Sequence, residues 1–185
     1  FSAVKKAKQI VTRATVLFAD VRGYTGLSQT LDATVVTQML GEFYEHCAQE
    51  VWAADGIINK LIGDAVLAVY NFPIAQEDHV EHAVQSAIGL QKRCAGLRAV
   101  SPDGDEDIGV GVGIHTGDIS IGEIGDFCRD FTAIGPAVNL AARLQTAAAP
   151  GEVLLSADAY ACVAASYPGI EPEELALKGI DDPVT

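Results

Sequence analysis

The stretch IINKLIGDAVLAVY (57–70) predicts a β-hairpin, because two hydrophobic runs are joined by the turn-forming pair Gly63-Asp64. A second stretch, TVLFADVRGYTGLS (15–28), predicts a strand that ends in the carboxylate of Asp20, followed by a glycine-bearing turn and a helix. A strand end and an adjacent hairpin tip can bring two carboxylates to one sheet edge. Paired carboxylates repel, so we infer a hard cation such as Mg²⁺ with a phosphate ligand between them. Two unrelated surface turns are the alternative.

The rest of the chain alternates predicted strands and helices. We expect a strand at 14–20, a helix at 32–54, the hairpin at 57–71, a helix at 77–98, strands at 108–115 and 118–124, a helix from Pro136 to Pro150-Gly151, a short strand and helix within 153–164, and a strand pair around 174–184. The core order βαββαβ is that of a ferredoxin-like α+β fold with its helices on one sheet face.

Composition narrows the class of protein. A chain of 185 residues is long enough for one domain with a core, and its net charge of −13 argues against a nucleic-acid partner. No apolar run reaches transmembrane length and no signal peptide is visible, so we expect a cytoplasmic domain without direct membrane contact, in a full-length protein that is either soluble or membrane-attached. Four scattered cysteines predict buried free thiols in a reducing compartment: Cys47, Cys94, Cys128 and Cys162.

Several tempting patterns are better explained structurally. The glycines of GVGVGIHTG (109–117) alternate along a strand instead of preceding a helix, so this stretch is not a dinucleotide-binding motif. Glycines on one face of a strand instead predict that a helix or a nucleotide approaches the strand closely. The stretch DGDED (103–107) resembles the start of a calcium loop, but Ile108 stands at the sixth position, where glycine is needed, and no glutamate follows at the twelfth. We therefore interpret SPDGDED (101–107) as a solvated acidic loop. All four histidines are expected to be structural or surface residues: His46, His79, His82 and His115.

The stretch DFTAIGPAVNLAARLQ (130–145) places Asn139 and Arg143 four residues apart, and therefore on one face of a helix. One interpretation is a buried structural salt bridge. The other is a clamp for negative charge that develops on a phosphoryl group, which is a common task of arginine.

Five stretches, in this order, resemble the catalytic domain of class III nucleotide cyclases: LFADVRGYTGLS, INKLIGDAVLAVY, GVGIHTGDISIGEIG, DFTAIGPAVNLAARL and LKG (177–179). The resemblance covers roughly residues 12–180 and implies residues 12–185 as the catalytic domain, with 1–11 as a lead-in from a longer protein. It also implies roles for individual residues, which are as follows: Asp20, Asp64 and the Val21 carbonyl hold two Mg²⁺ or Mn²⁺ ions; the backbone of Gly23, Tyr24 and Thr25 cradles the triphosphate; Lys60 and Thr132 read the base; Asn139 orients the ribose; Arg143 stabilises the transition state; Lys178 reaches the terminal phosphates.

The activity that this resemblance implies is an adenylyl cyclase, which converts ATP to 3′,5′-cyclic AMP and pyrophosphate. A lysine donor with a hydroxyl acceptor suits adenine, although Thr132 stands where many relatives carry aspartate, so guanylyl cyclase activity is an alternative. The Lys60/Thr132 pairing also resembles a branch with bicarbonate-responsive members, which predicts bicarbonate as a regulator. The resemblance further implies a homodimer with two composite active sites.

Two other classes of protein stay open. The first is a cyclase-like regulatory module that binds nucleotide without turnover. The second is a palm-type polymerase or dinucleotide cyclase, which would show a different hairpin motif and would lack the Asn139/Arg143 helix.

Overall fold

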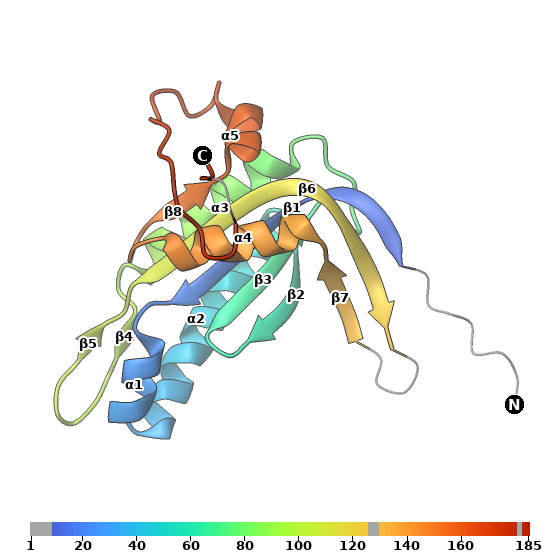
Figure 1. Ribbon diagram of the computed structural model, residues 1–185. Coiled ribbons are helices and arrows are strands. Elements are labelled where there is room, and N and C mark those ends of the chain that lie inside the picture. The colour runs from blue at the N-terminus through green and yellow to red at the C-terminus, as the bar shows by residue number, and fades with distance from the viewer. Residues whose placement is uncertain (1–8, 126–129, 181–182) are drawn as a thin grey trace, which may run out of the picture.

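The computed structural model describes residues 9–125, 130–180 and 183–185 and shows a curved sheet between layers of helix (Figure 1). Its elements are β1 (Ile10–Val21), α1 (Tyr24–Thr30), α2 (Ala33–Ala53), β2 (Ile57–Ile62), β3 (Ala65–Tyr70), α3 (His79–Cys94), β4 (Arg98–Ala99), β5 (Glu106–Asp107), β6 (Val110–Ile124), β7 (Asp130–Ile134), α4 (Pro136–Ala147), β8 (Val153–Leu155) and α5 (Ala157–Val163).

The central sheet has the strand order β2-β3-β1-β6-β7, and β8 pairs with β6 in parallel. All other neighbours in the sheet are antiparallel. The sequence β1-α2-β2-β3-α3-β6 reproduces the βαββαβ core, so the predicted ferredoxin-like fold is confirmed.

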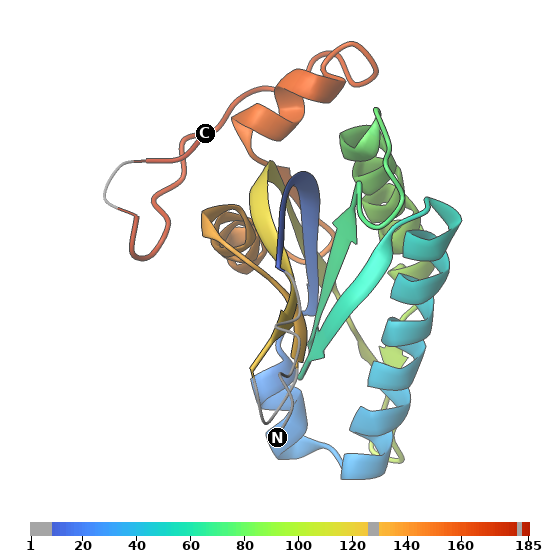
Figure 2. The same ribbon diagram turned by 90° about the vertical axis from the view of Figure 1, so that its right-hand side faces the viewer.

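Helices cover both faces of the sheet (Figure 2). The two core helices α2 and α3 share one face, as expected, and pack on the inward side chains of β1, β3 and β6. Helix α4 lies on the opposite face, where Ala137, Val138 and Ala141 contact β1, β3 and β6 residues such as Val16, which is fully buried. The single-face expectation therefore holds for α2 and α3 but not for the later helix α4.

The prediction of two separate strands at 108–115 and 118–124 is wrong, because β6 runs unbroken from Val110 to Ile124. It pairs with β1 from Ile10↔Ile121 to Val21↔Val110, and this long ladder leaves no turn at the HTG tripeptide. Gly117 instead lets α4 approach, since a Cβ there would lie 3.0 Å from the Ala137 Cβ.

The alternating glycines of β6 serve the packing of the chain itself. A Cβ on Gly113 would lie 2.2 Å from the Gln145 backbone nitrogen of α4, and a Cβ on Gly111 would lie 2.0 Å from the Arg22 guanidinium. Close approach of a helix, one of the two predicted reasons for these glycines, is thus what the structure contains.

Further details differ from the sequence predictions. Among the described residues, the strand pair around 174–184 is reduced to one bridge between Leu175 and Val184. The strands β4, β5 and β7 were not predicted, and β5 lies at the end of the predicted acidic loop 101–107. Cys47 and Cys94 are free and buried as expected, but Cys162 is free and exposed, and Cys128 lies outside the described residues. Among the helices of the described ranges, none is long and apolar enough to cross a membrane.

Candidate active site

The ends of β1 and of the β2–β3 hairpin meet, as the two motifs predicted. Asp20 is in register with Ala65, the first residue of β3, and the Val21 N–H donates a hydrogen bond of 3.2 Å to the Asp64 carbonyl. Gly63 takes a left-handed conformation with φ of 60°, which completes the two-residue turn between Ile62 and Ala65. Asp20 and Asp64, which are 44 positions apart in the sequence, therefore lie side by side where β1 ends and the β2–β3 hairpin turns.

The Asp20 carboxylate is partly buried and poorly compensated. Its Oδ1 accepts no hydrogen bond from the described residues, and the Arg22 Nη2 atom lies 3.4 Å from it. Burial raises the pKa of Asp20 above its ordinary value; the Arg22 guanidinium and the Gln145 side chain oppose this rise, and the Asp64 carboxylate adds to it. A buried oxygen without a donor, beside a second carboxylate, is suited to coordinate a cation.

A cavity of about 240 Å³ opens beside these residues. Asp20, Asp64 and the turn that contains Gly23, Tyr24 and Thr25 line it, whereas no described residue of β7, α4 or the C-terminal segment does. Gly23 has a φ of 75° and precedes α1, so the chain turns sharply around the cavity before the helix begins. The predicted metal ligands and the predicted triphosphate turn thus share one hollow.

The donor set fits a hard divalent cation. Carboxylate and carbonyl oxygens are the ligands that Mg²⁺ and Mn²⁺ prefer, and Asp20, Asp64 and the Val21 carbonyl offer that type of oxygen. No cluster of three or more histidine, cysteine, aspartate or glutamate residues suited to a metal occurs in the described ranges. With two carboxylates only, such a cation needs further oxygens, which a nucleotide triphosphate carries.

The two predicted base-reading residues lie on strands that touch. Lys60 of β2 forms an ion pair with Asp130 of β7, two residues before Thr132. Next to it, the Ala133 N–H donates a hydrogen bond of 3.2 Å to the Asn59 Oδ1 atom. The structure therefore brings Lys60 and Thr132 into one neighbourhood, with Thr132 buried and Lys60 partly exposed.

Asn139 and Arg143 lie on the side of α4 that faces away from the sheet. Asn139 is exposed and Arg143 half-buried, whereas the fully buried residues of α4, such as Ala141 and Leu144, face inward. Arg143 lies against Gly179, the residue that follows Lys178, where a Cβ would be 2.9 Å from the Arg143 Nη1 atom. Among the described residues, no ion pair joins Arg143 to another side chain.

Comparisons with known proteins agree with this arrangement. The family model for the adenylate and guanylate cyclase catalytic domain matches residues 6–185. The chain belongs to the class III nucleotide cyclase domains. Among its relatives, adenylate cyclase 1 of Rhizobium meliloti (strain 1021) is 33% identical over 133 residues, covering 71% of this chain and 20% of that protein. Guanylate cyclase soluble subunit beta-2 of Rattus norvegicus is 30% identical over 146 residues, covering 79% and 21%.

A solved structure extends the comparison to the whole fold of the cyclase domain. The crystal structure of the adenylyl cyclase CyaB from P. aeruginosa aligns with a TM-score of 0.87 at 29% sequence identity, covering 96% of this chain and 93% of that one. The chain spans about a fifth of the length of the two curated relatives, one an adenylate and the other a guanylate cyclase. The family is therefore settled and the polymerase alternative is excluded, while the choice of nucleotide is not decided by relatedness.

Sequence reasoning missed two residues, Arg22 and Tyr44, that hold Asp20 and the Gly63-Asp64 turn of this cyclase domain in place. Arg22 contacts Asp20 and also donates a hydrogen bond to the Gln145 carbonyl near the end of α4. Tyr44 of α2 donates its hydroxyl hydrogen to the Gly63 carbonyl in the hairpin turn. Arg22 lies inside the stretch TVLFADVRGYTGLS, but its sequence neighbours do not show which residues its guanidinium contacts. Tyr44 belongs to the apolar stripe of its helix, and nothing in the sequence indicates that its hydroxyl binds the hairpin turn.

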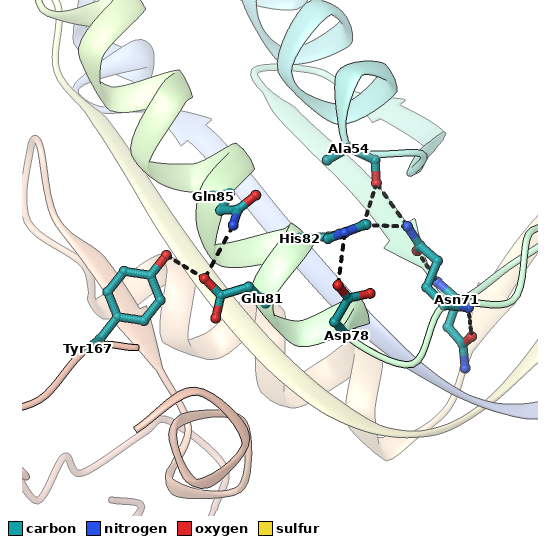
Figure 3. A network of polar contacts seen from close by, with 8 residues as sticks. Ala54, Asn71, Asp78, Glu81, His82, Gln85 and Tyr167 are labelled. Atoms are coloured by element: carbon teal, nitrogen blue, oxygen red, sulfur yellow. Dashed lines mark hydrogen bonds and ion pairs between the residues drawn. The ribbon is translucent and has the colours of Figure 1, made fainter. Parts of the chain in front are cut away.

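The histidines have structural partners, as expected. His82 lies 3.4 Å from Asp78 and 3.1 Å from the Ala54 carbonyl, within a polar network at the start of α3 that also contains Asn71 (Figure 3). His79 is 2.6 Å from the Thr15 hydroxyl, and His115 is 2.7 Å from the Ser156 hydroxyl. Burial lowers the pKa of both His79 and His115, which favours their neutral forms.

Proposed function

We propose that this cyclase domain converts ATP to 3′,5′-cyclic AMP and pyrophosphate. The observation that carries the proposal is the meeting of Lys60 on β2 with the Thr132 segment on β7, in a sheet that also presents Asp20 and Asp64 at the end of β1 and the hairpin turn. Adenine presents N1 as an acceptor and its 6-amino group as a donor, so an ammonium donor with a hydroxyl acceptor complements it. Guanine presents the opposite pattern along this edge and is served less well by a lysine.

The reaction forms a bond between the ribose 3′-oxygen and the α-phosphorus and breaks the bond from that phosphorus to the bridging oxygen, which leaves with pyrophosphate. Divalent cations held by Asp20, Asp64 and the Val21 carbonyl would lower the pKa of the 3′-hydroxyl and neutralise the phosphates. The Gly23–Thr25 turn holds the triphosphate and Lys178 its terminal groups. Asn139 orients the ribose, and Arg143 stabilises the negative charge that builds up on the phosphorus.

We also propose that each site is shared between two chains of a homodimer. Within one chain, Asp20 lies on the sheet side of α4, linked through Arg22 to the Gln145 carbonyl, whereas Asn139 and Arg143 face away from the sheet. The cavity beside Asp20 is lined by residues 20–26 and Asp64 among the described residues, and neither Asn139 nor Arg143 reaches it. A head-to-tail partner can supply these groups, and a two-fold dimer repeats the arrangement twice.

GTP is the second candidate substrate, favoured by one specific feature. The Thr132 hydroxyl can both donate and accept a hydrogen bond, so it discriminates between adenine and guanine less strictly than a carboxylate.

A nucleotide-binding module without turnover is a weaker candidate, because every residue implied for catalysis is present. Activation by bicarbonate rests on Thr132 and the branch resemblance alone.

Quantifying cyclic nucleotide formed from ATP and from GTP, with Mg²⁺ and with Mn²⁺, tests the proposal. We expect cyclic AMP and pyrophosphate in equal amounts, a higher kcat/KM for ATP than for GTP, and loss of both products in Asp64→Ala. Cyclic GMP as the main product would overturn the choice of base, and nucleotide binding without any product would favour the regulatory module. Repeating the assay with and without bicarbonate, at constant pH and ionic strength, tests whether bicarbonate raises turnover.

A further inference from the structure

The two end strands of the sheet, β2 and β7, curve toward each other (Figure 1). Two neighbouring side-chain contacts join them. Lys60 forms an ion pair with Asp130 across 70 residues of sequence, and Asn59 accepts a hydrogen bond from the Ala133 N–H across 74. The two tied residues of β7 lie on either side of Thr132, two residues before it and one after it. Consecutive side chains of β2 therefore hold the segment that carries Thr132.

The ion pair constrains a side chain that is otherwise free to move. A lysine ammonium sits on a flexible four-carbon stem and has three donors, so its position must be set by its partners. The Lys60 side chain is 24% exposed, and the Asp130 carboxylate, at 57%, is the more solvated of the two. Asp130 engages one donor and leaves the others available, which fixes the direction from which Lys60 can meet a base.

We propose that Asp130 is a positioning residue for base selection, whose carboxylate holds the Lys60 ammonium beside Thr132 while Asn59 keeps β7 in place. This inference rests on the proposed function, because it assigns Lys60 and Thr132 to the base. An exposed ion pair with a purely structural role changes stability little and has no reason to change which base is preferred. Selectivity between nucleotides is therefore the informative readout.

The test compares kcat and KM for ATP and for GTP in the wild type, Asp130→Asn and Asp130→Glu. Asp107→Asn is the matched control, since Asp107 pairs with Arg98 at 2.7 Å in an exposed ion pair on the small β4–β5 sheet. We expect Asp130→Asn to lower the ATP-to-GTP ratio of kcat/KM by about fivefold, mainly through KM for ATP. Asp130→Glu should retain most of the ratio, and the control should match the wild type.

A double-mutant cycle shows whether Asp130 acts through Lys60. In a Lys60→Met background, Asp130→Asn should cause no further change in the ratio, because the ammonium that it positions is gone. An unchanged ratio in Asp130→Asn alone, or the same loss with and without Lys60, would overturn the inference.

Equilibrium binding of 3′-deoxy-ATP and 3′-deoxy-GTP, which cannot cyclise, gives a readout that does not depend on turnover. The wild type should bind the adenine analogue more tightly, and Asp130→Asn should narrow that difference. If the wild type forms no cyclic nucleotide but Asp130→Asn still narrows the difference in binding, the proposed activity is refuted and the role of Asp130 is supported. If the wild type is active but Asp130→Asn leaves the binding preference unchanged, the role of Asp130 alone is refuted.

Discussion

The Tyr44 hydroxyl donates a hydrogen bond to the Gly63 carbonyl, so helix α2 holds the hairpin turn that presents Asp64. Burial raises the pKa of Tyr44 above its ordinary value, and the nearby Tyr24 and Asp64 side chains add to the rise, which keeps the hydroxyl protonated as a donor. The position of one proposed metal ligand thus depends on a side chain from another element, earlier in the sequence.

Tyr44→Phe should reduce cyclase activity while leaving the fold intact. The lost hydrogen bond is worth about 1 kcal/mol or less of stability, but it frees the turn beside Asp64, and we expect kcat to fall about threefold to tenfold. Steady-state kinetics together with thermal unfolding measure both effects. A Tyr44→Phe protein with wild-type kcat would show that the turn holds Asp64 without this contact.

Asp20→Asn should stabilise the domain at neutral pH and abolish turnover. Because burial raises the pKa of Asp20, the folded protein binds this proton more tightly than the unfolded chain does. The stability that this proton brings is present at low pH and is lost as the pH rises through the folded-state pKa, so the ionised carboxylate opposes folding near pH 7. Neutral asparagine removes that cost.

The check on Asp20 is the melting temperature as a function of pH, measured without metal or nucleotide. The gain in Asp20→Asn over the wild type should shrink as the pH falls and the wild-type carboxyl, whose pKa is raised by burial, becomes protonated. Asp107→Asn, which removes an exposed carboxylate, controls for the change in net charge. A melting temperature at pH 7 below that of the wild type would contradict the burial argument.

Mixing two inactive variants tests the composite site. Asp20→Ala and Arg143→Ala should each be inactive alone, while their heterodimer carries one intact site and one doubly damaged site. At equal amounts with free exchange, half of the dimers are heterodimers with one working site of two, so roughly a quarter of wild-type activity should return. Absence of recovery, with subunit exchange shown independently, would mean that each chain builds its own site.

Gly113→Ala should destabilise the domain strongly, because the added Cβ would meet the backbone of α4 at 2.2 Å from the Gln145 nitrogen and 2.4 Å from the Ala141 oxygen. Backbone cannot move aside as a flexible side chain can, so we expect a loss of about 2–3 kcal/mol in chemical denaturation. Gly41→Ala is the matched control: this glycine is exposed within α2, has no neighbour within 4 Å of the added Cβ, and should gain about 1 kcal/mol. Equal effects of the two changes would refute the packing role of Gly113.

Local patterns in the sequence were sufficient for most elements and for the meeting of Asp20 with the Gly63-Asp64 turn. The apolar stripe of α2, the Gly63-Asp64 turn and the strand that ends at Asp20 each depend on neighbours a few residues away, and each is found where it was predicted. The unbroken strand β6 was not predictable in this way. Its continuity comes from pairing with the whole of β1, about 100 residues earlier, and from the close approach of α4 at Gly117.

Resemblance to cyclases was enough to point to Lys60, Thr132, Asn139 and Arg143 from the sequence alone, but not to how a single chain arranges them. The contact between β2 and β7, the placement of α4 on the second sheet face, and the orientation of Arg143 away from the sheet all depend on how a twisted sheet curves and on which helices fit its two faces. The contact between β2 and β7 joins residues 70 or more positions apart, and it is set by the packing of the whole core. Periodicity within a segment carries no information about such relations, and the tertiary structure does.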